Sequence, residues 1–189
     1  MGERDNKKAL VSHFIDGKRI YLREVRLSDV GESYHRWLND PDVNRYLETR
    51  YIPQSLEGIK RYVERMDGNT SEIFLAICLK ENDKHIGNIK LGPINWIHRF
   101  ADVSLLIGEK AYWGKGIATE AITILTAFAF DILNLHKLRA GCYAENIGSA
   151  TAFMKAGFRE EGILKKQRCV KGQFQDEMLF GLCCEDWVK

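Results

Sequence analysis

The stretch Tyr112-Trp113-Gly114-Lys115-Gly116-Ile117-Ala118-Thr119-Glu120-Ala121 decides how this 189-residue chain is interpreted. It lies between a β-type run that ends near Ile107 and the longest helical pattern of the chain. The first turn of a helix has amide N–H groups without partners and carries partial positive charge. Glycine lets a phosphate approach these amides closely. The stretch therefore predicts an anion site built from backbone amides, to which Lys115 contributes mainly through its own N–H group.

Two other glycine-rich phosphate loops do not fit these residues. A Walker loop requires GxxxxGK[ST], which the chain does not contain. A dinucleotide fingerprint requires a third glycine, but Gly116 is followed by Ile117-Ala118-Thr119. A nucleotide-triphosphate enzyme is thus disfavoured. A GxG taken alone is also compatible with a turn that merely joins a strand to a helix.

The residues after the loop predict an alternation of helices and strands. Apolar residues from Ile117 to Leu133 recur at intervals of three and four, which predicts one long helix. Further elements are predicted in this order: a strand at Lys137–Tyr143, a helix at Ser149–Lys155 ended by Gly157, a strand from Phe158, a turn at Lys171-Gly172 and a strand at Glu177–Cys184.

The residues before the loop predict helices followed by an antiparallel meander. The predicted elements are a hairpin around Asp16-Gly17, a helix capped by Ser28-Asp29, a short helix through Val43, Tyr46 and Leu47, an amphipathic helix from Ser55 to about Asp67, and strands at Ile73–Leu79, His85–Leu91 and Ala101–Ile107. The whole predicts a mixed α/β fold. We expect one domain over residues 1–189, with residues 1–10 as a flexible tail.

Bulk composition narrows the class of protein. A formal net charge of +2 gives no reason to expect a nucleic-acid or membrane partner. The five cysteines show no CxxC spacing, so we expect structural thiols and no metal site. The polar segment Met1–Lys8 is unlike a secretory signal, and no run reaches the ~20 apolar residues of a membrane span. These features predict a cytoplasmic protein. We expect a monomer or homodimer.

Two blocks of sequence resemble the GNAT acetyltransferase superfamily. The stretch Tyr112–Ala121 resembles its acetyl-CoA loop, and Asn146-Ile147-Gly148-Ser149 with Lys155-Ala156-Gly157-Phe158 resembles its second signature. The blocks stand in the family's order and spacing. Together with Trp37–Val43, they are most similar to the branch of ribosomal-protein N-terminal, spermidine and amino-sugar acetyltransferases. The resemblance spans about residues 19–184.

This resemblance implies a fold and a donor substrate. The family fold is a mostly antiparallel sheet of about seven strands, flanked by helices and splayed between the fourth and fifth strands. The implied donor is acetyl-CoA, with CoA as product. Its implied binding residues are Leu105, Leu106 and Ile107 for the pantetheine arm, Gly114, Lys115, Gly116, Ile117, Ala118 and Thr119 for the pyrophosphate, and Asn146 for an amide contact. Asn146 also suits the N-cap of the next helix. The family usually has Gln or Arg three residues before the first glycine of the loop, and this chain has Ala111 there.

The resemblance also implies catalytic candidates for direct attack by a primary amine. An alkylammonium must lose a proton before it attacks. Asp102 matches an acidic base of the family, with Glu109 in reserve, although a solvent-facing strand carboxylate explains Asp102 equally well. The family's proton-donating Tyr is Phe153 here, which has no proton to give. Ser149 is the stand-in donor, and its other explanation is a hydroxyl at a helix start.

The acceptor amine is the least defined partner. The resemblance places it near the first helices and the last hairpin, where His35, Arg45, Tyr46, Trp96 and His98 are weak candidates. Arginines suit the phosphates of a nucleotide, whereas a polycation requires clustered carboxylates. We therefore expect an amino-sugar nucleotide or a protein N-terminus before a polyamine. A CoA-binding module without turnover is the alternative from another class.

Overall fold

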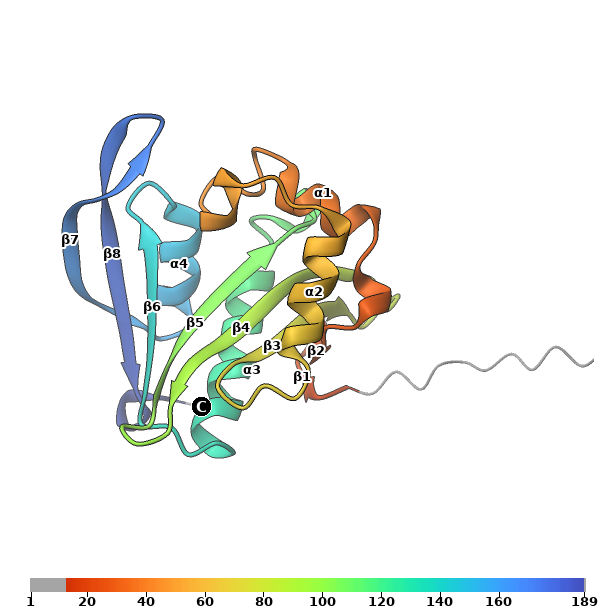
Figure 1. Ribbon diagram of the computed structural model, residues 1–189. Helices are drawn as coiled ribbons and strands as arrows, with labels where there is room; N and C mark the ends of the chain where they lie inside the picture. The colour runs from red at the N-terminus through yellow and green to blue at the C-terminus, as the bar shows by residue number, and fades with distance from the viewer. Residues whose placement is uncertain (1–12, 189) are drawn as a thin grey trace, which may run out of the picture.

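A computed structural model describes residues 13–188, so the predicted tail at residues 1–10 lies outside the described residues. Its centre is one eight-stranded sheet with the order β1-β2-β3-β4-β5-β6-β8-β7 (Figure 1). The strands are β1 (Ile15–Asp16), β2 (Ile20–Glu24), β3 (Ile73–Leu79), β4 (His85–Asn95), β5 (Phe100–Ile107), β6 (Lys137–Tyr143), β7 (Arg159–Val170) and β8 (Gln173–Cys183). The expected mixed fold is confirmed, and the two-residue β1 raises the strand number from about seven to eight.

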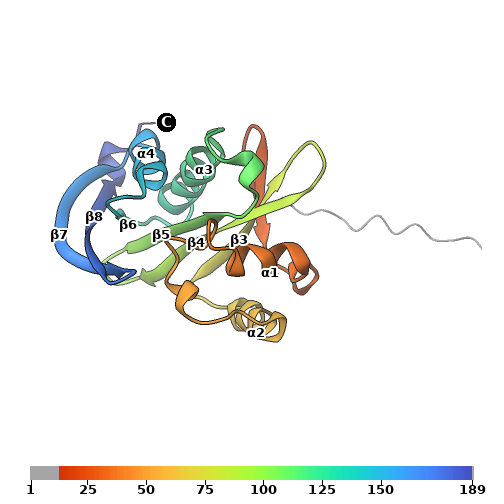
Figure 2. The same ribbon diagram turned by 90° about the horizontal axis from the view of Figure 1, so that it is seen from above.

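Helices cover both faces of the sheet, as Figure 2 shows from above. One face carries α1 (Glu32–Asn39) and α2 (Leu56–Met66), and the other carries α3 (Ile117–Asp131) and α4 (Ile147–Lys155). The larger core lies under α3 and α4, because α3 presents apolar residues to the sheet along its whole length. A smaller core under α1 and α2 contains Tyr34, Trp37, Val43, Ile59 and Val63.

Two local predictions before α2 are wrong. The short helix expected through Val43 and Leu47 is a series of turns, and a 3-10 helix, η2 (Glu48–Tyr51), follows it. The helix expected to be capped by Ser28-Asp29 begins later, at Glu32. Asp29 instead ends the 3-10 helix η1 (Leu27–Asp29) and forms a buried ion pair with Arg23 at 2.7 Å. Asp29 Oδ2 also accepts the Arg26 N–H at 2.7 Å, so this carboxylate caps η1 and pairs with Arg23, and it does not start α1.

The sheet forks between β5 and β6, its one parallel pair among the described residues. Pairing covers Phe100↔Lys137, Ala101↔Leu138 and Asp102↔Arg139 and then stops. Both strands continue: β5 stays paired with β4 to Ile107, and β6 stays paired with β8 to Tyr143. The fork matches the splay predicted between the fourth and fifth strands, shifted by one in number because of β1. Within residues 13–188, no helix has the length and apolar character to cross a bilayer.

Candidate active site

The glycine loop, which we define as residues 113–118, connects the end of β5 to α3 through the short 3-10 helix η3 (Lys110–Tyr112). Gly114 and Gly116 have φ values of 70° and 76°, a left-handed conformation that side chains disfavour. A Cβ atom on Gly114 would meet no heavy atom within 4 Å, so the loop faces open space there. No side chain caps the start of α3. The N–H groups of its first turn are therefore open to an external anion.

An ion pair between Arg19 and Glu120 holds the glycine loop in place, and we call this pair the brace. The Glu120 carboxylate accepts hydrogen bonds from the backbone N–H and the Nε of Arg19, both at 2.7 Å. The same guanidinium donates to the Lys115 carbonyl oxygen at 2.8 Å. Burial alone would raise the pKa of Glu120, but the hydrogen bonds from Arg19 lower it below its usual value. Glu120 stays charged, and Arg19 offsets that charge next to the loop.

This brace was not predicted. Glu120 is visible in the sequence as an acidic residue in the first turn of α3, but Arg19 lies on the approach to β2, about a hundred residues earlier. Their pairing requires β2 to pass beside the start of α3, which is a property of the fold. A second unpredicted contact also holds the loop: Trp113 Nε1 donates to the Ile107 carbonyl oxygen at 2.7 Å.

The remaining predicted residues of the loop differ in exposure. Lys115 is exposed, and its ammonium lies 5.5 Å from the centre of the Tyr112 ring. The Ile117 side chain is buried in the large core, whereas Ala118 and Thr119 are half-buried. Ile117 is thus available to a ligand through its backbone alone, which agrees with an anion site built from amides.

The fork leaves one edge of β5 without a strand partner. From Val103 to Ile107 the strand pairs with β4 on one side, and the β6 ladder has already ended on the other. Leu105, Leu106 and Ile107 lie in this segment, half-buried. Backbone groups on such an edge need an outside hydrogen-bond partner. A chain with amide groups, such as a pantetheine arm, fits that requirement.

On the other side of the fork, Asn146 and Ser149 lie at the start of α4. Asn146 Oδ1 accepts a hydrogen bond from the Ser149 N–H at 3.2 Å, so Asn146 is the N-cap of the helix. Its Nδ2 has no hydrogen-bond partner among residues 13–188 and remains available to a ligand. Burial raises the pKa of the Cys142 thiol, and a hydrogen bond with Ser149 opposes that rise. The Ser149 hydroxyl therefore lies against β6.

Asp102 lies at the point where β5 and β6 separate. Its carboxylate accepts a hydrogen bond from Arg139 Nε at 2.8 Å, and both side chains are nearly half exposed. Strand alternation puts Asp102 on the same face as Ser104 and Leu106, the face covered by α1 and α2. The carboxylate is thus accessible on that face, with an arginine beside it.

The other two catalytic positions lie in packed surroundings. A hydrogen bond from Lys84 lowers the pKa of Glu109, which also accepts hydrogen bonds from Trp37 Nε1 and Arg36. These contacts tie Glu109 to α1. Phe153 is buried in the large core, where its ring packs against those of Phe158 and Phe180. A packing role accounts for the residue that replaces the family's tyrosine.

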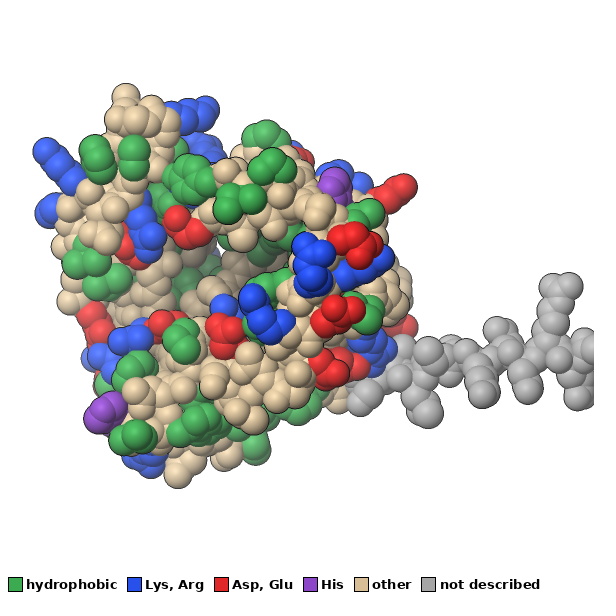
Figure 3. Space-filling model, in the orientation of Figure 1, with side chains coloured by type: hydrophobic (Ala, Val, Ile, Leu, Met, Phe, Trp, Pro, Cys, Tyr) green, Lys and Arg blue, Asp and Glu red, His purple; other side chains and the backbone are tan. Residues whose placement is uncertain are grey.

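A hollow of about 880 Å³ lies between α2 and the sheet and opens beside the fork (Figure 3). Aromatic rings form much of its wall, from Tyr34, Tyr46, Tyr62 and Phe74. Leu105, Leu106 and Ser104 of the unpaired β5 edge form part of its floor. Its charged lining residues are Glu48, Arg61, Arg65 and Lys90. The hollow is therefore aromatic and carries more positive than negative charge.

The candidate acceptor residues do not lie together in the structure. Tyr46 lines the hollow, and its hydroxyl donates to the Glu145 carbonyl oxygen at 3.1 Å. His35 and Arg45 do not line it, although Arg45 lies 5.2 Å from the Tyr46 ring centre. Trp96 lies on the turn between β4 and β5, half exposed, where it donates to the Thr70 carbonyl oxygen. His98, on the same turn, stacks on Phe100.

A polar network beside the hollow was also not predicted. The Tyr143 hydroxyl, at the end of β6, lies 2.5 Å from Glu48 Oε1 and accepts a hydrogen bond from Arg50 at 2.9 Å. Burial raises the pKa of Tyr143. Arg168 of β7 connects Glu48 to the buried Glu177 of β8. The network connects η2 to β6, β7 and β8, the strands on the side of the fork opposite β5.

Comparison with known proteins agrees with this geometry. Residues 19–159 match the model of the acetyltransferase (GNAT) domain. The chain is 30% identical to the protein named "Probable N-acetyltransferase YjcK" of Bacillus subtilis, over 91% of this chain and 98% of YjcK. It is 28% identical to the spermidine N(1)-acetyltransferase of Vibrio cholerae, covering 84% and 89% of the two chains.

The fold is likewise shared with solved structures. The crystal structure of spermidine N-acetyltransferase from Vibrio cholerae in complex with CoA and spermine superposes with a TM-score of 0.80 at 25% identity, over 89% of this chain and 97% of that one. The matched region contains the glycine loop, the fork and the start of α4. The chain belongs to the GNAT family of N-acetyltransferases.

Proposed function

We propose that this protein transfers an acetyl group from acetyl-CoA to a primary amine held in the hollow. The observation that carries the proposal is the alignment of three features around one fork: the amides of the glycine loop, the unpaired β5 edge and the opening of the hollow. When bound, acetyl-CoA supplies an acetyl group activated as a thioester. The amides of residues 114–119 hold its pyrophosphate, and the backbone of Leu105–Ile107 and Asn146 Nδ2 hold its pantetheine amides.

We further propose that Asp102 accepts the proton that the acceptor ammonium must lose. Its carboxylate is accessible at the base of the fork and shares a face with the hollow floor at Ser104. Attack of the neutral amine on the acetyl carbonyl forms the C–N bond and breaks the C–S bond. Ser149, at the other side of the fork, is the proposed donor of the proton that the departing CoA thiolate takes up. Glu48 is a second candidate base, because it is the acidic side chain among the described residues that line the hollow.

The lining charges support an acceptor that carries negative groups. Arg61 and Arg65, one helical turn apart on α2, form no ion pair among residues 13–188, although the ring of Tyr62 lies 5.2 Å from the Arg65 guanidinium. Lys90 is paired with Glu72. A polyamine would need carboxylates at these positions, whereas phosphates suit arginine. We propose an amino-sugar nucleotide as acceptor, with a protein N-terminus next.

The comparisons give a specific reason to test a polyamine as well, because the Vibrio cholerae relative and the solved structure are both named spermidine acetyltransferases. The experiment offers the purified protein acetyl-CoA with matched panels of amino-sugar nucleotides, N-terminal peptides and polyamines, and measures released CoA thiol and acetylated mass. We expect turnover with an anionic acceptor, and a KM about tenfold higher in R61Q/R65Q with the KM for acetyl-CoA unchanged.

The other outcomes are equally informative. Preferred turnover of spermidine would replace the anionic acceptor with a polycation. Tight CoA binding without thiol release across all panels would favour a non-catalytic CoA-binding module. The variant K60Q is the matched control for R61Q/R65Q, because Lys60 lies on the same helix but does not line the hollow.

A further inference from the structure

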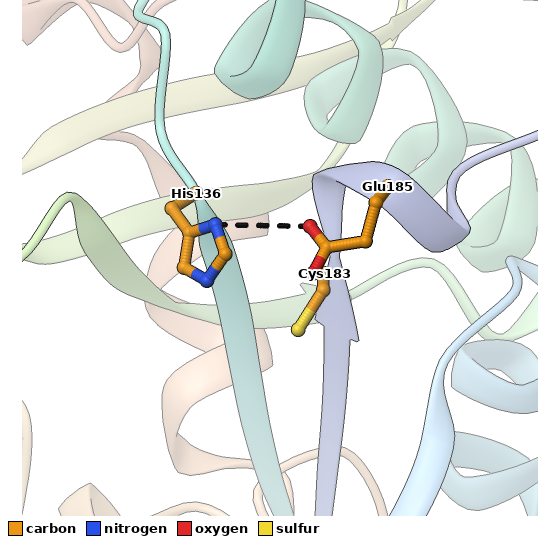
Figure 4. A group of neighbouring side chains, drawn as sticks. All are labelled: His136, Cys183 and Glu185. Atoms are coloured by element: carbon orange, nitrogen blue, oxygen red, sulfur yellow. Dashed lines mark ion pairs between the residues drawn. The ribbon is translucent and has the colours of Figure 1, made fainter.

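A cluster of nucleophilic side chains lies at the end of the sheet opposite the glycine loop. Here β6 begins, β8 ends and the 3-10 helix η4 (Cys184–Asp186) follows (Figure 4). Lys137 of β6 pairs with Cys183 of β8, and the Cys184 N–H donates to the His136 carbonyl oxygen at 2.9 Å. The backbone thus fixes His136 beside Cys183, Cys184 and Glu185.

Three donor atoms of this cluster form a nearly equilateral triangle. His136 Nδ1 and Glu185 Oε2 lie 3.7 Å apart. Cys184 Sγ lies 3.9 Å from that nitrogen and 3.4 Å from that oxygen. Bond lengths to tetrahedral zinc place such donors about 3.3–3.6 Å apart. The three atoms therefore need to move by only a few tenths of an ångström to share one ion.

A fourth donor lies within reach. Cys183 offers its Sγ within 4.8 Å of a ring nitrogen of His136 and a carboxylate oxygen of Glu185. Figure 4 shows this sulfur pointing to a different side from the Glu185 carboxylate, with the His136 ring facing both residues. Completing a four-coordinate site needs a rotation of the Cys183 side chain, and a water molecule can otherwise take the fourth position.

We propose that His136, Cys184 and Glu185, with Cys183 as the fourth donor, form a site for a zinc ion. Thiolate and imidazole donors select zinc over the hard cations magnesium and calcium. Access is open, because the side chains of His136 and Glu185 are 45% and 64% exposed. This site was not expected from the sequence, since His136 lies 47 positions before Cys183 and the two cysteines are adjacent.

Two neighbouring cations are already paired with carboxylates. Lys137 is engaged by Glu161 at 2.7 Å, and Arg159 by Asp186 at 3.6 Å. Arg99 is the cation whose charge acts on Cys184, and its carbonyl oxygen accepts the His136 N–H at 2.6 Å. The glycine loop follows the other end of β5, a strand of eight residues and about 26 Å. The proposed base Asp102 lies nearer, opposite Arg139 of β6, which is three residues or about 10 Å along the chain from His136. A bound ion would therefore join η4 to the start of β6 without direct contact with the glycine loop or Asp102.

The test measures zinc binding by the full chain after removal of metals with a chelator. Calorimetric titration with Zn²⁺ should give one ion per chain, and Mg²⁺ should give no heat. H136A and C184S should each weaken zinc binding at least tenfold. C169S is the control, because Cys169 is also an exposed thiol but lies on β7. The wild type, H136A, C184S and C169S should all transfer acetyl groups at the same rate. The test of the zinc site is therefore independent of the test of the proposed function.

A second, spectroscopic measurement reports the coordination geometry of the bound ion directly. Co²⁺ in place of Zn²⁺ should give wild-type protein the visible absorption of tetrahedral cobalt and a thiolate charge-transfer band. H136A, whose exposed side chain can be removed with little effect on packing, should lose the tetrahedral spectrum. Absence of stoichiometric zinc binding by the wild type would overturn the proposal. So would equal zinc affinity in H136A, C184S and the wild type.

Discussion

The glycine loop and the hollow both adjoin the unpaired edge of β5, but they are built from different parts of the chain. The loop consists of backbone: two left-handed glycines, the amides of one helix start and a carbonyl held by Arg19. The hollow consists of side chains from two helices, three strands and a connecting loop. Backbone recognition suits a group that every member of a family binds, and side-chain recognition suits a group that differs between members.

The difference has a physical basis in how each region tolerates substitution. A left-handed turn accepts few residues besides glycine, so its sequence is narrowly constrained. An aromatic wall keeps its shape through many substitutions of similar volume. The donor is therefore specified by a short motif, while the acceptor is specified by charges such as those of Arg61 and Arg65. The following substitutions separate the two regions.

The largest effect is expected for G114V. The left-handed glycine Gly172, φ 78°, gives a matched control, because a Cβ atom on either glycine would meet no neighbour within 4 Å. G114V and G172V therefore impose similar backbone strain in open space. We expect G114V to weaken CoA binding at least a hundredfold by calorimetry, because its side chain takes the place of the phosphate. G172V should bind CoA as the wild type does. Equal weakening of CoA binding by both substitutions would show that backbone strain destabilises the fold, and not that the introduced valine side chain occludes the phosphate site.

The contrast also explains what the sequence predicts. The glycine loop, the α3 helix, the meander and the fork follow from local patterns and from the resemblance around Gly114 and Gly116. The brace between Arg19 and Glu120 does not, because its partners are distant in sequence and each reads as an ordinary surface charge. The residues that line the hollow are harder to predict than this ion pair. Tyr46 was among five weak candidates and lines it, but Arg61, Arg65 and Tyr62 sit in an unremarkable amphipathic helix.

The two wrong local predictions have a cause of shorter range. Asp29 has the right chemistry for a helix N-cap, but its carboxylate binds the buried Arg23 instead. The segment around Val43 has helical spacing, and the Asn44 side chain donates to the Leu38 carbonyl oxygen and holds it in turns. At both places, a side-chain hydrogen bond between residues six positions apart overrides the helical pattern.

The next effect concerns turnover with binding preserved. D102N should lower kcat about a hundredfold, because the amide cannot accept the proton from the acceptor ammonium. CoA affinity should stay within twofold, since the glycine loop is untouched. E48Q is the comparison variant, because Glu48 lines the hollow and hydrogen-bonds to Tyr143. Should E48Q lose the rate and D102N keep it, the base belongs to the hollow and not to the fork.

A smaller effect should follow from loss of the brace. R19M removes the side-chain hydrogen bonds to Glu120 and to the Lys115 carbonyl, and it leaves the carboxylate with backbone N–H donors but no cation beside the phosphate site. Arg19 is half exposed, so solvent screens part of the loss, and we expect CoA affinity to fall about tenfold. R19M/E120Q should regain part of that affinity, because it removes the stranded charge. The acceptor KM should not change in either protein, which titration at saturating acetyl-CoA would check.

The smallest effect is a dependence of the hollow's wall on pH. Burial lowers the pKa of His85 below its ordinary value of about 6.5, and its ring packs against Tyr34 and Trp37 under α1. As the pH falls, the unfolded chain takes up this proton before the folded one does, so the free energy of unfolding falls with it. Thermal unfolding between about pH 7.5 and 5.5 should show this slope, above the range where carboxylates titrate. H85Q should flatten it, and H98Q, at an exposed histidine, should not.

Because Tyr34 lines the hollow, the acceptor KM should rise over the same pH range while CoA affinity stays level. A parallel fall in CoA affinity would mean that the glycine loop and the hollow both depend on the packing around His85.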